Sequence, residues 1–263
     1  VGIAHPVRAR IEMTACGGGQ SGSGIDMVGC HQGIIARNSM HQLAANAVQA
    51  KGGTADVTIR QNHLVDAGER GVNMGGSTGF TFFRPPLSTT DPNAEARAIR
   101  VVANLIEGGA ASLAFVGCVD CLAANNTIVD PTNWILRILQ ETVSSGGYTF
   151  LPASQGRFIN NLVYFDRSDL STYVNIGPDT DPTSFVFAHN LWYAHDDPGQ
   201  SQPDLPVAEQ GGLVGQDPAF SSGRAIDATS PAAAAGLDDP EVIADYLGNC
   251  SASPPSIGAY EVP

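Results

Sequence analysis

The chain of 263 residues carries 26 acidic and 13 basic side chains, and its net charge of −13 at pH 7 disfavours a nucleic-acid partner, which needs a basic surface. No run of 18 apolar residues exists, so the sequence predicts no membrane span. A charged fraction of only 15%, with 30 glycines and 17 prolines, indicates an all-β chain with many tight turns.

One structural unit is repeated along the chain. The segments IDMVGCHQGIIARNSM (25–40), QAKGGTADVTIRQNHL (49–64) and LAFVGCVDCLAANNTI (113–128) share two short apolar runs, a small corner between them and a closing Asn. This Asn recurs at spacings of 24, 42, 22, 35 and 29 residues, at Asn38, Asn62, Asn104, Asn126, Asn161 and Asn190. A period in the low twenties with occasional insertions is typical of a solenoid.

The period also selects the kind of solenoid. Three short strands and three turns fill about 22–24 residues, which is one coil of a right-handed, single-stranded parallel β-helix with coils ~4.8 Å apart. We therefore predict an all-β parallel β-helix of about six to eight coils, with loops inserted at 82–97 and 131–155. The repeated Asn is expected to stack as a ladder at one corner, because its amide can bond the next coil and Asn tolerates a left-handed turn.

The chain has five cysteines, Cys16, Cys30, Cys118, Cys121 and Cys250. Cys30 and Cys118 occupy the same corner of coils roughly 14 Å apart along the axis, whereas a disulfide needs Cα atoms within ~7 Å. We therefore expect no bond between these two. Cys118 and Cys121 have C-x-x-C spacing, which without a second such pair predicts a local disulfide or two buried thiols in preference to a zinc site.

The last part of the chain differs in character from the coils. We expect a single domain over 1–263, in which residues 1–200 form the coils and residues 201–263 form a capping tail. The tail contains DPAFSSGRAIDATSPAAAAGLDD (217–239) and closes with PSIGAYE (255–261). This ending resembles the C-terminal end of many bacterial secreted right-handed β-helix proteins. The resemblance implies a protein that is secreted or lies at the cell surface.

Strand alternation predicts a polar column on the outside of one sheet. In NAVQAK (46–51) the alternation points Gln49 and Lys51 outward. The outward residue one coil earlier is Asp26, and the outward residue one coil later is Asn73. Lys51 is expected to stand beside this column, where its replacement should cost under ~0.5 kcal/mol because it is exposed.

Glu69 and Arg70 follow at the turn into the next coil, and Arg70 is expected to be exposed as well. The order and near one-coil spacing of Lys51 and Arg70 resemble those of β-helix lyases of the chondroitinase B and alginate lyase type. In that family a Lys and an Arg on successive coils flank the uronic acid that is cleaved. The resemblance implies that Lys51 and Arg70 are catalytic and that the partner is an acidic polysaccharide. The side chains expected to contact this substrate are Asp26, Gln49, Asn73, Arg60, Arg84, Glu69 and His63.

The chemistry of β-elimination explains these residue types. A cation neutralises the uronate carboxylate and acidifies the C5 proton, and a base removes that proton. A lysine acts as such a base when a neighbouring cation lowers its pKa, and an arginine binds a carboxylate in a bidentate fork.

The calcium ligands of that lyase family include acidic residues shortly before its Lys. The matching stretch here, HQLAANAVQA (41–50), contains neither Asp nor Glu. We therefore expect no metal and no cofactor, and neutralisation of the uronate falls to Arg70, Arg60 or Arg84.

Two other functions remain open. Glycoside hydrolysis needs two converging carboxylates, and Asp26 with Glu69 forms the outward pair on nearby coils. A regular polar face can also bind carbohydrate without turnover, or belong to a structural β-helix that is a piece of a longer protein.

The N-terminal end of the solenoid predicts contact between copies of the chain. VGIAHPVRARIEM (1–13) offers apolar side chains but no amphipathic helix that could cover the first coil. An uncovered coil exposes unpaired strand edges, which natural proteins avoid. We expect a homodimer or higher assembly through residues 1–25.

Overall fold

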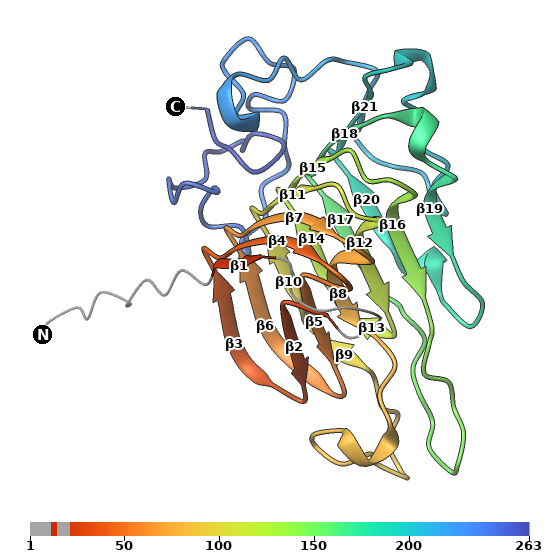
Figure 1. Ribbon diagram of the computed structural model, residues 1–263. Coiled ribbons are helices and arrows are strands. Elements are labelled where there is room, and N and C mark those ends of the chain that lie inside the picture. The colour runs from red at the N-terminus through yellow and green to blue at the C-terminus, as the bar shows by residue number, and fades with distance from the viewer. Residues whose placement is uncertain (1–11, 15–21, 263) are drawn as a thin grey trace, which may run out of the picture.

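The structure, a computed structural model, describes residues 12–14 and 22–262 and consists of three parallel sheets wound around one hydrophobic core (Figure 1). In most of the coils the chain passes from one sheet to the next, and the strands pair in parallel with their counterparts in neighbouring coils. The predicted all-β parallel β-helix is confirmed. Every helix in the described residues is a 3-10 turn of three residues, and none could span a membrane.

The strands are assigned to sheets that we call A, B and C. Sheet B contains β2 (Ile25–Val28), β5 (Val48–Lys51), β8 (Arg70–Gly75), β12 (Ala111–Val116), β16 (Trp134–Leu139) and β19 (Thr172–Ile176). Sheet C contains β3 (His31–Ala36), β6 (Thr54–Arg60), β9 (Ala96–Arg97), β10 (Arg100–Val102), β13 (Cys118–Val119), β14 (Leu122–Ala124), β17 (Arg157–Ile159) and β20 (Val186–Ala188). Sheet A contains β1 (Glu12–Thr14), β4 (Ser39–Leu43), β7 (His63–Ala67), β11 (Leu105–Glu107), β15 (Thr127–Val129), β18 (Leu162–Phe165), β21 (Leu191–Ala194) and β22 (Leu213–Val214). The 3-10 turns are η1 (Phe80–Phe82), η2 (Arg167–Asp169), η3 (Pro182–Ser184), η4 (Pro198–Gln200) and η5 (Ser222–Arg224).

The core is a stack of inward columns, one residue from each coil. Register places six apolar side chains of sheet B in one such column: Ile25, Val48, Val72, Leu113, Leu136 and Val174. Toward the C-terminal end the core becomes aromatic, with the ring of Phe158 stacked on Trp192 at 5.6 Å between centroids. Because each inward residue packs on copies of itself, burial of apolar surface stabilises the stacking of coils as well as each coil.

The asparagine ladder is confirmed. Each interior ladder Asn donates from Nδ2 to Oδ1 of the Asn in the next coil at 2.9–3.1 Å, and its backbone N–H shares that acceptor at 2.8–3.1 Å. The left-handed residue of the corner is the one before each ladder Asn, with φ between 50° and 61°: Arg37, Gln61, Ala103, Asn125, Asn160 and His189. Asn therefore occupies this corner because its amide bonds the next coil. The left-handed conformation expected for Asn is adopted by the residue before it.

The ladder ends on a carboxylate. Glu209 accepts from the backbone N–H and the Nδ2 of Asn190 through Oε1, at 3.0 and 2.7 Å, and from Nε1 of Trp192 through Oε2 at 2.8 Å. Burial raises the pKa of Glu209, although these hydrogen bonds oppose the shift. The last rung thus needs only an acceptor, which a carboxylate supplies as well as an amide.

Two insertions leave the coils between sheets B and C, at residues 76–95 and 140–156. The first prediction, 82–97, begins too late and includes β9. The second, 131–155, wrongly includes β16, whose short apolar run is broken by Arg137. Glu95 joins the two insertions, because its fully buried carboxylate accepts from Gly52 N–H, from Thr78 N–H and Oγ1, and from Oγ1 of Thr142.

The C-terminal tail has two parts. Leu205, Val207 and Val214 pack against the end of the main core. The remainder, residues 217–262, lies along the flank of the helix, where Ile226, Ala232 and Ile257 cover outward apolar side chains of β18 and β21. We call this second part the strap.

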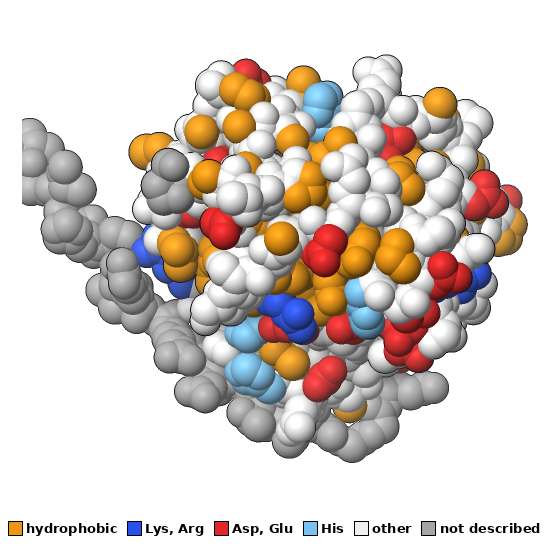
Figure 2. Space-filling model, turned by 90° about the horizontal axis from the view of Figure 1, so that it is seen from above, with side chains coloured by type: hydrophobic (Ala, Val, Ile, Leu, Met, Phe, Trp, Pro, Cys, Tyr) orange, Lys and Arg blue, Asp and Glu red, His pale blue; other side chains and the backbone are white. Residues whose placement is uncertain are grey.

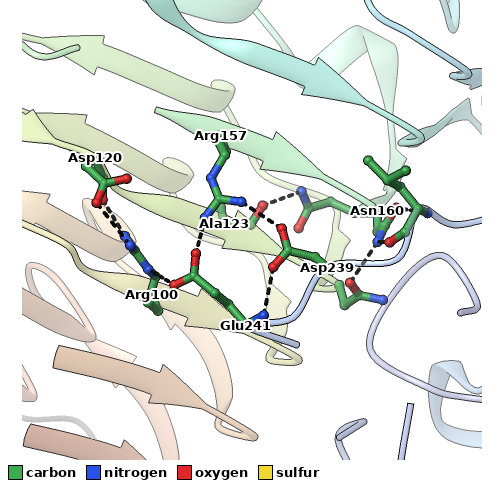
Figure 3. Close-up of polar contacts among 10 residues, drawn as sticks. Arg100, Asp120, Ala123, Arg157, Asn160, Asp239 and Glu241 are labelled. Carbon is green, nitrogen blue, oxygen red and sulfur yellow. Dashed lines mark hydrogen bonds and ion pairs between the residues drawn. The ribbon is translucent and has the colours of Figure 1, made fainter. Parts of the chain in front are cut away.

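Charged and amide side chains fix the strap to sheet C and to the ladder corner (Figure 3). Arg157 binds Asp239 through NH1 at 2.7 Å and also contacts Glu241, which in turn binds Arg100. Asn160 exchanges two hydrogen bonds of 2.8 Å with the backbone of Leu237. The strap thereby spans several coils, and the backbone oxygen of Asp245 accepts from Nε2 of Gln61, at the ladder corner of an early coil, at 2.6 Å.

Cys118 and Cys121 form a disulfide and are fully buried, so the first of the two alternatives for this pair holds. The prediction that Cys30 and Cys118 are not bonded is also confirmed. Cys30 and Cys250 are exposed and free. Cys16 and most of the predicted interface at 1–25 lie outside the described residues.

Candidate functional site

Five of the predicted site residues come together in one depression on the outer face of sheet B, of about 340 Å³. Its lining is almost entirely polar and comprises Ser23, Asp26, Asn46, Gln49, Lys51, Glu69, Arg70, Ser77 and Glu141. The predicted column is in register, since Asp26 pairs with Gln49 and Gln49 with Asn73. Strand alternation in consecutive coils is therefore sufficient to assemble the floor of this site.

Lys51, the last residue of β5, forms an ion pair within the depression. Its Nζ lies 3.3 Å from Oδ2 of Asp26 and 3.5 Å from Oε1 of Gln49. The Lys51 side chain is 19% exposed and that of Asp26 is 43% exposed, so the ion pair opens to solvent. An anionic ligand can therefore reach Lys51 by replacing or joining a solvated carboxylate.

Arg70, the first residue of β8, is less accessible than predicted. Its side chain lies along the strand, donating from NH1 to Oδ1 of Asn73 at 3.0 Å and from NH2 to Oε1 of Glu141 at 2.8 Å. Arg70 is buried, with 9% of its surface exposed, so the expectation of an exposed arginine is wrong. Removal of Arg70 would leave Glu141 without its ion-pair partner, and such a change costs more than an exposed substitution.

Two buried polar atoms in this depression have no hydrogen-bond partner among the described residues. They are Oδ1 of Asn46 and Nε of Arg70, on side chains that are 4% and 9% exposed. Nδ2 of Asn46 donates to Gln49 at 3.3 Å, which fixes the orientation of the amide. Next to the charged groups of this site, one buried acceptor and one buried donor thus lack a partner among the described residues.

A glycine allows the first insertion to leave close to these side chains. Gly76 has a φ of +146°, and a Cβ there would lie 2.6 Å from Nε2 of Gln49 and 3.4 Å from Cδ of Lys51. Only a residue without a side chain can pass this close, and Ser77 then contributes to the wall of the depression.

The outer face of sheet B continues the column beyond the depression. Asn73 is in register with Ala114, Ala114 with Arg137, and Arg137 with Asn175. Arg137 donates from Nε to Asn175 at 3.0 Å, and its guanidinium lies 4.1 Å from the ring centroid of Trp134. Burial, and then the nearby charge of Arg70, lower the pKa of Arg137, so the two guanidinium groups share one electrostatic environment.

Sequence reasoning missed Glu141, Arg137 and Asn46. Extending the outward column by two coils from Asn73 reaches Arg137, but the loop predicted at 131–155 includes this residue. Glu141 follows β16 and returns toward Arg70 at the start of an insertion, so no periodic signal marks it.

Three of the predicted substrate-binding residues lie elsewhere. Arg60 ends β6 on sheet C. Arg84 belongs to the first insertion, where its NH1 donates to the backbone oxygens of Thr81 and Phe83. His63 begins β7 on sheet A and hydrogen-bonds Glu107 at 2.7 Å. None of these three residues lines the depression on sheet B.

A calcium ion would need carboxylate and other oxygen ligands from the depression. Its carboxylates at Asp26 and Glu141 are each paired with a cation of the chain, which leaves few free oxygen ligands. Within the part of the chain that the structure describes, no three His, Cys, Asp or Glu side chains are grouped so that they could hold a metal ion.

The depression therefore combines two cations, three carboxylates and two amides on the outer face of sheet B, and an arginine stacked on an indole lies further along the same face. Such a surface suits a polar, hydrogen-bonding ligand that lies across several coils. In the comparisons with known proteins, no family model matches the chain, and a search of curated proteins found no significant match.

Proposed function

We propose that the outer face of sheet B binds an acidic polysaccharide that contains uronate, with the sugar chain lying across the coils from β2 to β19. One observation carries this proposal: Lys51 and Arg70, from consecutive coils, line the same depression together with the amides of Asn46 and Gln49. Lysine and arginine cations bind carboxylates, and amides bind hydroxyl groups, so this set matches a uronate ring.

The extended column favours a polymer over a single sugar. Arg137 and Asn175 lie two and three coils beyond Asn73 along the sheet, which corresponds to about 10 and 14 Å at the spacing of parallel strands. A chain of several sugar units could therefore contact Lys51 at one end and Arg137 at the other. A spaced series of cations is expected to select a polyanion over a neutral glycan.

Cleavage by β-elimination is the catalytic form of this proposal, and the nearness of Lys51 and Arg70 favours it. Arg70 would hold the uronate carboxylate, and Nζ of Lys51, once released from Asp26 as the free amine, would take the C5 proton. The electrons of the C5–H bond would form the C4–C5 double bond while the C4–O bond breaks, and the leaving oxygen would take up a proton.

Glycoside hydrolysis is the alternative that the carboxylates of the depression favour. Asp26, Glu69 and Glu141 all line it, so two carboxyl groups could flank a glycosidic bond. Asp26 is already paired with Lys51 and Glu141 with Arg70, so hydrolysis would require both ion pairs to open. Binding without turnover needs none of these steps.

The proposal includes a site of action outside the cell. The disulfide between Cys118 and Cys121 supports it, because such bonds persist mainly in oxidising compartments.

The experiment is incubation with alginate, pectate and glycosaminoglycans, followed by three measurements on the same samples: binding, absorbance of unsaturated uronate, and new reducing ends. Binding of at least one polyanion supports the proposal, and binding of none overturns it. Absorbance of unsaturated uronate identifies a lyase, and new reducing ends without this absorbance identify a hydrolase. Binding without either product identifies a binding module.

Lys51→Ala is the matched variant, because Lys51 is partly exposed. Loss of one charge-assisted contact should weaken binding roughly tenfold to a hundredfold. Arg97→Ala removes the same charge from the exposed side of sheet C and should leave the affinity unchanged. Equal effects of the two variants would show that only the overall charge of the molecule matters.

A further inference from the structure

A second group of chemically capable side chains lies on the outer face of sheet A, on a different side of the helix from the depression on sheet B. Figure 2 looks onto the molecule from the top of Figure 1, where the strands of sheet A are labelled, and shows histidine side chains next to charged ones. A depression of about 380 Å³ on this face is lined by Arg37, Asn38, Ser39, Gln61, His63, Tyr246 and Leu247. The polysaccharide proposal uses none of these residues.

Ser39 and His41 form a hydrogen-bonded pair in this group. They are two residues apart on β4, so both side chains point to the outside of sheet A. Oγ of Ser39 lies 2.6 Å from Nε2 of His41, within the distance at which a histidine can take a proton from a hydroxyl group. Both side chains are partly exposed, so a substrate can reach the hydroxyl group.

A second histidine and a carboxylate support this pair. The rings of His41 and His63 meet edge to face, with 5.9 Å between centroids and 79° between planes. Nε2 of His63 lies 2.7 Å from Oε1 of Glu107, and Nε of Arg224 lies 3.3 Å from Oε2 of the same carboxylate. The hydrogen bond with His63 is the main cause of the lowered pKa of Glu107, which keeps this carboxylate charged. His63 is thereby held in place against the ring of His41.

A cation lines the same depression as the hydroxyl group of Ser39. Arg37 is exposed and, within the described part of the chain, its side chain makes one hydrogen bond, from Nε to Oε1 of Gln61 at 3.0 Å. Its two terminal NH2 groups remain available on the rim of the depression that Ser39 also lines. Such a group can stabilise the negative charge that develops on a carbonyl oxygen when a hydroxyl attacks it.

We infer that Ser39 and His41 form a nucleophile and general-base pair that hydrolyses carboxylic esters of exposed alcohols, with Arg37 as the oxyanion-stabilising cation and His63 as a positioning residue. The depression has a volume of about 380 Å³, which suits a small acyl group carried by a larger molecule. This inference is independent of the polysaccharide proposal.

The reaction balances without a cofactor. Oγ of Ser39 attacks the carbonyl carbon while its proton passes to Nε2 of His41, and the carbonyl oxygen becomes an oxyanion near Arg37. The intermediate collapses, the ester C–O bond breaks, and the leaving alcohol takes the proton from His41. Water then attacks the acyl-Ser39 bond, His41 takes up its proton, and the acid leaves as Ser39 regains the proton.

A fluorophosphonate probe tests this inference on the unmodified chain, because it bonds covalently to activated serines. We expect mass spectrometry to find the adduct on Ser39, and the labelling rate to fall at least tenfold in His41→Ala. Ser222→Ala is the matched control, since Ser222 is exposed on the strap, and it should label Ser39 at the wild-type rate. Absence of an adduct on Ser39, or equal rates in wild type and His41→Ala, would overturn the inference.

Hydrolysis of 4-nitrophenyl acetate gives a second measurement. We expect Ser39→Ala to abolish the protein-dependent rate, and His63→Gln to lower kcat with little change in KM, as for a residue that positions the base. An unchanged rate in Ser39→Ala would also overturn the inference.

Discussion

The strongest test of the fold concerns one rung of the asparagine ladder, Asn126. Its fully buried side chain makes four hydrogen bonds: Nδ2 donates to Asn161 and to the backbone of Val101, both at 2.9 Å, and Oδ1 accepts twice from Asn104 at 3.0 Å. A typical buried hydrogen bond contributes about 1 kcal/mol net. Asn126→Ala should therefore lower the free energy of unfolding by about 4 kcal/mol.

The first rung is the matched control. The side chain of Asn38 donates to Oδ1 of Asn62 at 2.9 Å, and this is the one side-chain hydrogen bond that it makes within the described residues. The same estimate predicts a loss of about 1 kcal/mol for Asn38→Ala. The two variants thus differ in the number of ladder bonds and share the same change of residue.

Urea unfolding followed by tryptophan fluorescence measures both losses, because Trp192 is fully buried in the aromatic part of the core. The slope of the free energy against urea should stay constant, so that the shift in midpoint reports stability. If Asn126→Ala costs no more than Asn38→Ala, the ladder does not stabilise the stacking of coils, and the reasoning is refuted.

Three further predictions concern other parts of the fold. Because burial raises the pKa of Glu209 above 4.5, its contribution to stability is present at low pH and is lost as pH rises through the raised pKa. The stability of wild type relative to Glu209→Gln, measured by urea unfolding, should fall over that range, and a rise would contradict the assignment. Glu95→Ala leaves four hydrogen-bond donors without their acceptor, so amide hydrogen exchange should become faster in both insertions. Asp91→Ala, also in the first insertion, is the control and should leave the exchange rates of both insertions unchanged. Light scattering should show the dimer or larger assembly that the sequence predicts, and a monomeric wild type would exclude it.

The periodic features of the sequence predicted the parts of the structure that repeat. The outward column of Asp26, Gln49 and Asn73 follows from two-residue alternation in strands that lie one above another. The ladder follows from Asn at one position of each coil, since only stacking brings amides separated by 22 to 42 residues within hydrogen-bond distance. Both predictions rest on a residue pattern within one coil and on the spacing between consecutive coils.

The same reasoning failed where a side chain turns along the strand or a charge interrupts an apolar run. Arg70 was expected to be exposed because it stands at a turn, but its long side chain folds over Asn73 and is covered by Glu141. Arg137 was placed in a loop because its charge breaks the run of β16, although its guanidinium reaches Asn175 and the face of Trp134. A long amphipathic side chain can lie flat on a sheet, and alternation alone does not show this.

The walls of both depressions come from segments outside the repeat. On sheet B the floor is formed by β2, β5 and β8, and the insertions add Ser77 and Glu141. On sheet A the floor belongs to β4 and β7 with the turns before them, and the strap adds Tyr246 and Leu247. A bare coil has a nearly flat outer face, because every coil must match its neighbours to stack. A concave site on such a helix therefore requires segments that leave the coil, and these segments carry no periodic signal from which their contacts could be predicted.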